Sequence, residues 1–311
     1  MRKLSMLLSA LFITLLAVAQ IGGIGGLGDK LLKKDPLQIK KPPITTSLDD
    51  AKWAQPDKDN FTPHEALSSL MTLKRTPNGG FVLQPGYYEF HDQSYCLKAG
   101  THGPGGGDGY LYAPPLGPMD DIVMAIVRNS VNHPEVHQHD IQLLLWSIIA
   151  RAKYENLDNK LKLVATQLLT PKQLASINRS GLDIIPQAVQ QKAIDEAPAP
   201  LRAVLEAEAK LRQMLTTPGS TFEEIERVAV LSGIPGLGEG SREVPSGRWS
   251  LHPDGYYVRY LPAGYTNTVV QIWVPQGSPA VGKEYDPATH IAVPGNTARQ
   301  RLIQSGRPYK N

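Results

Sequence analysis

The feature of this sequence that most constrains its fold is a long block of helical periodicity between two regions with strand patterns. The block runs from Asp121 to about Gly233, and its apolar residues recur every three or four positions. Short aromatic and β-branched runs, separated by Gly and Pro turn signals, flank it on both sides. We therefore expect an α+β fold in which a small β-region packs with a helical body and a small C-terminal β-unit follows.

Within the block, several segments begin with a residue that favours a helix N-terminus. Asp140 and Thr221 precede two of these segments, and Asp120 precedes another. The expected helices span residues 122–129, 141–154, 159–169, 171–178, 186–196, 201–215 and 222–231. The apolar stripe of 201–215 predicts packing against other helices.

The flanking regions predict strands. Before the block, short strands separated by turns are expected over residues 81–83, 87–90 and 94–97, followed by a Gly-rich loop at 100–109. After it, strands are expected at 249–251, 256–261 and 268–274, the last two joined as a hairpin through Pro262-Ala263-Gly264. The final residues show weak periodicity and several Pro and Gly, which predicts a loosely ordered tail.

The N-terminus has the three parts of a secretory signal in order. Met1-Arg2-Lys3 is a positive start, residues 4–18 are apolar, and Ala17-Val18-Ala19 is a small-x-small cleavage site. The expected organisation is therefore a signal peptide at 1–19, a flexible lead-in at 20–49, an α+β domain with a helical body at 50–233, a small β-unit at 245–279 and the tail at 280–311.

Charge and hydropathy exclude some partners. The formal net charge is +3, far below the basic excess of most nucleic-acid binders, so no DNA, RNA or anionic membrane is expected as the main partner. After the leader no apolar stretch approaches the roughly 18 residues of a membrane helix. We expect no integral membrane segment after cleavage, and a secreted, periplasmic or cell-surface location.

The chain contains one cysteine, Cys96, although exported proteins usually use cysteines in disulfide pairs. Gln142 lies on the predicted helix at 141–154, on a face with Leu145, Trp146 and Ile149. A buried carboxamide there needs partners. A buried thiol beside it permits a specific reaction, in which the sulfur displaces ammonia from the amide and an internal thioester results.

These residues are similar to the thioester domains of Gram-positive bacterial surface adhesins. In that family a cysteine between an aromatic and an aliphatic residue pairs with the glutamine of a helix motif Thr-Gln-x-Ala-aliphatic-Trp. The matching residues here are Tyr95-Cys96-Leu97, Gln142 and Leu145-Trp146, while Ile141 and Leu144 replace the Thr and the Ala. The resemblance implies a thioester-like domain and adhesion or cross-linking by covalent attachment to amines of a protein or surface polymer. Such an attachment is a single-turnover acyl transfer that needs no cofactor.

Two alternatives remain open. In one, Cys96 and Gln142 are ordinary core residues of a non-catalytic envelope or secreted interaction protein. In the other, Cys96 is the nucleophile of a hydrolase, which needs a histidine within reach and a third group to orient it.

The histidines near these residues suggest further roles. His102 follows Cys96 closely and could deprotonate an incoming amine. His133, His137 and His139 precede Gln142, and the four-residue spacing of the first two suits a zinc site on a helix. Pro134 interrupts such a helix, so these three residues are weak metal candidates and a polar turn is the simpler interpretation.

Overall fold

The computed structural model describes residues 41–105, 107–182 and 185–310. The chain divides into two compact units. The described part of one unit is Lys41 together with residues 185–196, which include helix α7 (Gln187–Asp195). The other unit contains the remaining described residues and every other helix and strand named below. The expected signal peptide at 1–19 and most of the expected lead-in lie outside the described residues.

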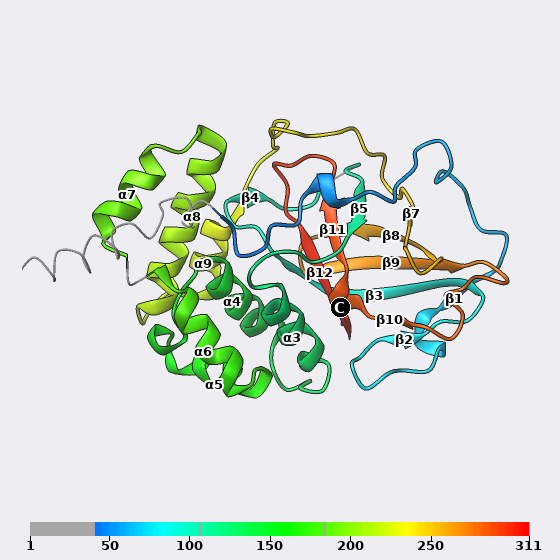
Figure 1. The fold of residues 1–311 in the computed structure, drawn as a ribbon, viewed down its shortest axis with the longest axis horizontal. Helices are drawn as coiled ribbons and strands as arrows, with labels where there is room; N and C mark the ends of the chain where they lie inside the picture. The colour runs from blue at the N-terminus through cyan, green and yellow to red at the C-terminus, as the bar shows by residue number, and fades with distance from the viewer. Residues whose placement is uncertain (1–40, 106, 183–184, 311) are drawn as a thin grey trace, which may run out of the picture. The chain divides into compact units, whose positions relative to one another are not determined.

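The larger unit is built on an eight-stranded sheet in the order β5-β11-β12-β3-β9-β8-β7, with β1 paired to β3 in parallel and the other pairs antiparallel (Figure 1). The strands are β1 (Leu67–Ser69), β3 (Gly86–Cys96), β5 (Tyr110–Ala113), β7 (Ser250–Leu251), β8 (Tyr257–Pro262), β9 (Asn267–Val274), β11 (Ile291–Pro294) and β12 (Leu302–Pro308). Two small pairs are separate: β2 (Phe81–Val82) with β10 (Glu284–Tyr285), and β4 (Thr101–His102) with β6 (Val230–Leu231).

The sheet curls so that its two end strands approach each other. The backbone N–H of Tyr112 on β5 donates to the Ser250 hydroxyl on β7 at 3.1 Å. One face of the curled sheet encloses an apolar cluster rich in aromatic rings, including Phe81, Tyr256 and Tyr260. Along β8, the alternation of side chains places Val258 and Tyr260 on this side.

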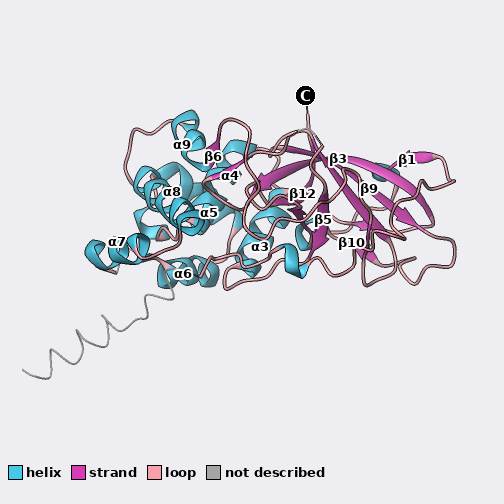
Figure 2. Cartoon of the chain, turned by 90° about the horizontal axis from the view of Figure 1, so that it is seen from above, coloured by secondary structure: helices cyan, strands magenta, loops and turns pink. Residues whose placement is uncertain are grey.

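The helices of this unit gather beside the sheet (Figures 1 and 2). They are α3 (Asp120–Ser130), α4 (Gln138–Ile149), α5 (Asn159–Leu168), α6 (Pro171–Ser180), α8 (Ala199–Thr216) and α9 (Phe222–Ala229). Local sequence explains their starts: Thr221 and Glu224 form a capping box at α9, and Thr170 and Gln173 form one at α6. The expected α+β class is confirmed. Among the described helices, none combines the length and the apolar character needed to cross a membrane.

Helix α4 is the most buried of these helices. It contacts α3, α5, α8 and α9, and it also lies against β3. Accordingly its residues are apolar around most of the circumference, and Trp146 and Leu145 have no exposed surface. This position brings the side chains of α4 to the end of strand β3.

The C-terminal segment differs from expectation. Residues 280–311, expected to be a loosely ordered tail, instead supply β10, β11 and β12, and β12 lies between β11 and β3 inside the sheet. The strands of the expected unit at 245–279 belong to the same sheet rather than to a separate body, since β9 pairs with β3. The separate strands expected at 87–90 and 94–97 form one strand, β3. Strand pairing is decided by distant segments, so local periodicity understates it.

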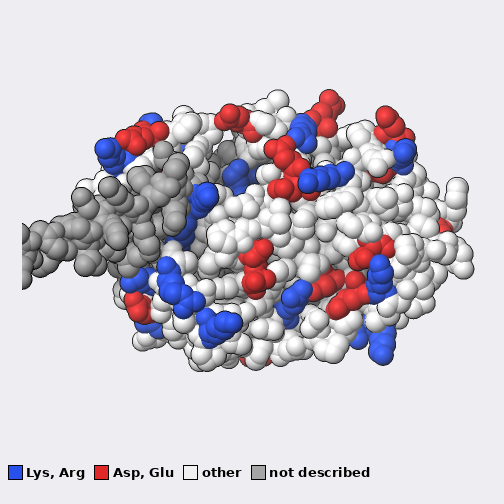
Figure 3. Space-filling model, viewed as in Figure 1, with Lys and Arg blue, Asp and Glu red and all other residues white. Residues whose placement is uncertain are grey.

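The end of the expected lead-in is packed rather than extended. Ile44 is 1% exposed, and the backbone N–H of Thr45 donates to the carbonyl of Leu116 at 2.7 Å. Gly117, with φ +133°, leaves no room for a Cβ against the carbonyl of Pro43. Residues 42–48 are thus part of the globular unit. On the face shown in Figure 3, acidic and basic side chains are interspersed between wide uncharged areas.

Candidate functional site

The structure brings Cys96 and Gln142 together. Cys96 is the last residue of β3, and Gln142 lies in the second turn of α4. The backbone N–H of Cys96 donates to Gln142 Oε1 at 2.9 Å, and Gln142 Nε2 donates to the Cys96 carbonyl at 3.1 Å, across 46 positions of sequence. The two residues are 0% and 2% exposed. Both functions of the carboxamide therefore contact the residue that carries the thiol.

The pleat of β3 explains why this backbone is available. The N–H of Leu97 donates to the Arg301 carbonyl on the β12 side, and the backbone groups of Cys96 face the opposite way. On that opposite side the pairing with β9 ends at Gln93. The Cys96 N–H and carbonyl would be buried without partners, and the Gln142 amide takes the place of the missing strand.

A second glutamine makes a related contact one helical turn earlier. Gln138 Nε2 donates to the carbonyls of Thr266 at 2.7 Å and Ser94 at 3.3 Å. Ser94 precedes Cys96 by two residues, so both face the same side of β3. Gln138 and Gln142 together join α4 to the end of the strand.

Burial dominates the chemistry of the thiol. It raises the pKa of Cys96 to about 11, against the opposing influence of the Lys98 N–H, the Trp146 indole and the cationic groups of Arg301 and Lys98. The sulfur donates to the Lys98 carbonyl at 3.3 Å and accepts from the Lys98 N–H at 3.4 Å. At neutral pH the group is a protonated thiol held in a tight turn.

Aromatic side chains lie near the thiol, since Trp146 and Tyr265 both interact with it. Trp146, one turn after Gln142, has no exposed surface, and its ring centroid lies 5.9 Å from Phe222 and 6.2 Å from Tyr265. His139 stacks on Phe222 with the ring centroids 3.9 Å apart. The Trp146 indole lowers the pKa of the thiol. Its Nε1–H nevertheless has no hydrogen-bond partner within the described part of the chain. A buried donor is thus left beside the thiol.

Two cationic residues that the sequence analysis did not single out also act on this site. Burial and the nearby Arg301 lower the pKa of Lys98 to about 8, and burial lowers the pKa of Arg301 to about 10. Lys98 stands two residues after Cys96, a proximity that could have drawn attention to it. Nothing local marks Arg301, because only its position just before β12 brings it here.

The structure does not group the histidines around the thiol. His102 lies on β4, where its backbone bonds to Ala298 and Gln300, and no hydrogen bond joins it to Cys96 or Gln142. His133 contacts Glu135 at 2.8 Å on the surface, His137 precedes α4, and His139 stacks on Phe222. In residues 41–105, 107–182 and 185–310, no three or more His, Cys, Asp or Glu side chains are placed to hold a metal ion.

Chemically, the arrangement combines an acyl donor, a thiol and a water-poor setting. The Cys96 N–H polarises the Gln142 carbonyl in the direction that favours nucleophilic attack on its carbon. Comparisons with known proteins add nothing to this geometry: no family model matches the chain, and no similar curated protein or solved structure was found.

Proposed function

We propose that Cys96 and Gln142 form an internal thioester through which this protein attaches covalently to an amine-bearing partner. The observation that carries the proposal is the pair of reciprocal hydrogen bonds between the Gln142 carboxamide and the Cys96 backbone in a buried setting. These bonds fix the Gln142 carboxamide against the backbone of the residue that carries the thiol, and such positioning lowers the entropic barrier to a reaction between the two side chains.

The reaction balances without an added oxidant or reductant. The Cys96 sulfur attacks the Gln142 side-chain carbon, the carbon–nitrogen bond breaks, and the amide nitrogen leaves as ammonia with the thiol proton. A primary amine of the partner then attacks the same carbon, forms an amide with the former Gln142 side chain and returns the Cys96 thiol. One bond is exchanged for another at each step, so the protein acts once rather than in a cycle.

Neighbouring groups support each step. The Cys96 N–H lies on the oxygen that gains charge during attack, and the unpartnered Trp146 indole N–H offers a donor beside the sulfur. Lys98, with its pKa near 8, is better placed than His102 to accept the thiol proton. Burial of the pair protects a thioester from hydrolysis.

The biological setting in this proposal is an exported protein that acts in the envelope, at the cell surface or outside the cell. The signal-like sequence at 1–19 supports export, and the resemblance to adhesin thioester domains supports adhesion or cross-linking. The target is an amine on a protein or surface polymer.

The intact mass of freshly purified protein tests the bond directly. We expect a mass lower by one ammonia than that calculated for the mature chain, and after methylamine an adduct that maps to Gln142. The Cys96→Ala variant should show neither change. Gln167→Glu, altered at an exposed glutamine of α5, should keep both.

A mass equal to that calculated for the mature chain, with Gln142 unmodified and Cys96 freely alkylated after unfolding, would reject the thioester. Glutamate at position 142 would instead show that the bond had formed and hydrolysed.

One observation favours the non-catalytic alternative. Gln138 bonds to the same strand without any thiol, so Gln142 can be explained as the second half of a structural join. In that case the protein is an interaction module, and Gln142→Glu leaves its behaviour intact apart from stability. The hydrolase alternative has less support, because no histidine bonds to Cys96 among the described residues.

A further inference from the structure

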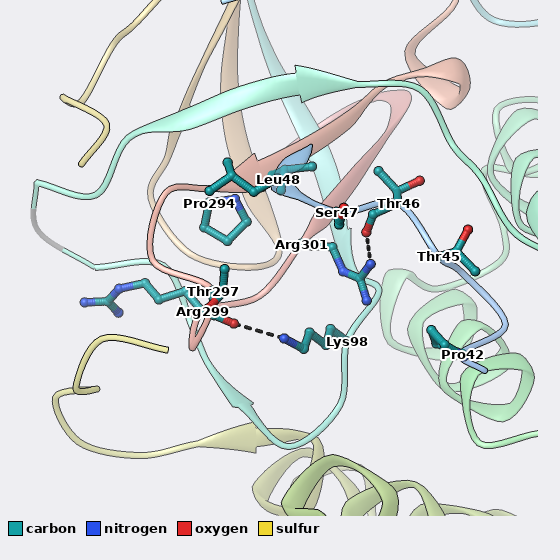
Figure 4. A pocket seen from close by; sticks show the side chains of 11 residues that line it. Pro42, Thr45, Thr46, Ser47, Leu48, Lys98, Pro294, Thr297, Arg299 and Arg301 are labelled. Atoms are coloured by element: carbon teal, nitrogen blue, oxygen red, sulfur yellow. Dashed lines mark hydrogen bonds between the residues drawn. The ribbon is translucent and has the colours of Figure 1, made fainter. Parts of the chain in front are cut away.

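A pocket of about 250 Å³ lies next to the turn that follows Cys96 (Figure 4). It is formed where three distant segments meet: the packed segment at 42–48, Lys98, and the chain from β11 to Arg301. Its lining residues are Pro42, Thr45, Thr46, Ser47, Leu48, Lys98, Val293, Pro294, Thr297, Arg299 and Arg301. All belong to the larger unit.

The lining is cationic on one side. Lys98 and Arg301 lie near one another, and each retains donors after its one side-chain hydrogen bond to the described part of the chain. Lys98 Nζ donates to the Thr297 carbonyl at 2.9 Å, and an Arg301 Nη atom donates to the Thr46 carbonyl. Arg301 Nε is buried and lacks a partner among the described residues.

The acidic groups nearby have other partners. Within residues 41–105, 107–182 and 185–310, no Asp or Glu lines the pocket. Asp50 and Glu208 act on Arg301 from outside it, but Asp50 accepts hydrogen bonds from Ser47, and Glu208 pairs with Arg151 at 3.5 Å.

The third lining cation contributes less. Arg299 pairs with Asp108, and Figure 4 shows its side chain extending away from Lys98 and Arg301. Lys98 and Arg301 are thus close cations, and after burial, which is the larger cause, repulsion from Arg301 also lowers the pKa of the lysine. An anion placed between them would relieve that repulsion.

Part of the remaining lining is apolar, beside the hydroxyl-bearing Thr45, Thr46, Ser47 and Thr297. Leu48, Val293 and Pro294 face the same space and suit a hydrocarbon body rather than a second charge. A pocket of this size holds a small molecule or the end of a larger one.

We infer that this pocket binds the carboxylate of a small organic acid, with Lys98 and Arg301 on the carboxylate and Leu48, Val293 and Pro294 on its apolar body. This function does not depend on the thioester. Inorganic phosphate shares the charge but has no apolar body to use these walls.

Calorimetric titration tests the inference with benzoate as the probe, benzamide as its neutral analogue and inorganic phosphate as the bare anion. Each is titrated into the whole protein and into Cys96→Ala, which cannot form a thioester. We expect saturable benzoate binding in both, with benzamide and phosphate each about tenfold weaker or more. Lys98→Met and Arg301→Gln should each weaken benzoate by about tenfold or more.

Arg242→Gln is the matched control, since it removes an exposed arginine outside the pocket that pairs with Asp49. Lys98→Met keeps the inference testable should loss of the Arg301 bond to Thr46 prevent folding. Equal binding of benzoate and benzamide, tighter binding of phosphate, no saturable binding, or benzoate affinity unchanged in Lys98→Met would each overturn the inference. Because Cys96→Ala is included, failure here is distinguishable from failure of the thioester.

Discussion

Burial, more than ion pairing, sets the chemistry of individual side chains around the end of β3. It is the largest influence on the pKa of Cys96, of Lys98 and of Arg301, and it acts against the charged form of each. The thiol is thereby kept protonated, while the lysine approaches neutrality near pH 8. Because of this difference in pKa, Lys98 is the proton acceptor beside the buried Cys96 thiol.

The lowered pKa of Lys98 predicts a pH-dependent stability. Below about pH 8 the folded state carries the cost of a buried charge, and between about 8 and the ordinary value of 10.5 the folded lysine is neutral while the unfolded one is charged. The unfolded state then binds more protons, so stability rises with pH across that window. Relative to Lys98→Met, the wild type should gain about 1–2 kcal/mol there, after allowance for partial exposure.

Urea unfolding at several pH values across this window measures the gain, with the exposed Lys52→Met as the control for losing a lysine. Parallel pH profiles of wild type and Lys98→Met would contradict the prediction.

At the scale of elements, the central feature is a helix that continues a sheet. The pairing of β3 with β9 stops at Gln93. Beyond that residue, side-chain amides of α4 take the place of the backbone groups of a neighbouring strand. The helix expected at 141–154 spans Gln138–Ile149 instead, with Asp140 inside its first turn and no side-chain cap at His137, and the two glutamines set its register against β3. This join also determines which amide meets the thiol.

The two glutamines that join α4 to β3 should contribute unequally to the free energy of unfolding. Gln142→Ala leaves a buried N–H and a buried carbonyl of Cys96 unpaired, which should cost about 2–4 kcal/mol of unfolding free energy. Gln138→Ala affects a half-buried side chain and should cost about 1 kcal/mol.

Both substitutions are best measured by urea unfolding in the Cys96→Ala background, where no covalent bond can form. If both substitutions lowered the free energy of unfolding by the same amount, the Gln142 contact would contribute no more to stability than the Gln138 contact.

At the scale of the whole molecule, the last thirty or so residues complete the sheet whose first strand along the chain is β1, at Leu67–Ser69. Strands β11 and β12 lie between β5 and β3, so removing them divides the sheet into two parts. Leu302 and Ile303 on β12 have no exposed surface. The helices share their hydrophobic core with the sheet, because Ile303 and Val293 belong to the same apolar cluster as the buried helix residues.

Truncation after residue 279 should therefore abolish cooperative unfolding rather than trim a tail. We expect loss of the near-ultraviolet circular dichroism signal and of a sharp urea transition. Removal of Lys310 and Asn311 alone, beyond the end of β12, is the control and should leave both unchanged. A sharp transition in the long truncation would contradict the placement of β12.

The sequence by itself determined the helices, the hairpin of β8 and β9, and the choice of Cys96 and Gln142 as candidates. Helical bonds and caps such as Thr221 with Glu224 join residues three or four apart, so their signals are local. A single cysteine and a glutamine on an apolar helix face are likewise visible without a structure.

Only the tertiary structure decided which segments pair and what the site contains. The inner position of β12, the contact of Gln142 with the Cys96 backbone, and the meeting of Lys98 with Arg301 all depend on residues far apart in sequence. Strand partners and burial are set by the packed whole, since a strand's hydrogen bonds are made to another segment. The local pattern of apolar residues does not indicate which segment a strand pairs with.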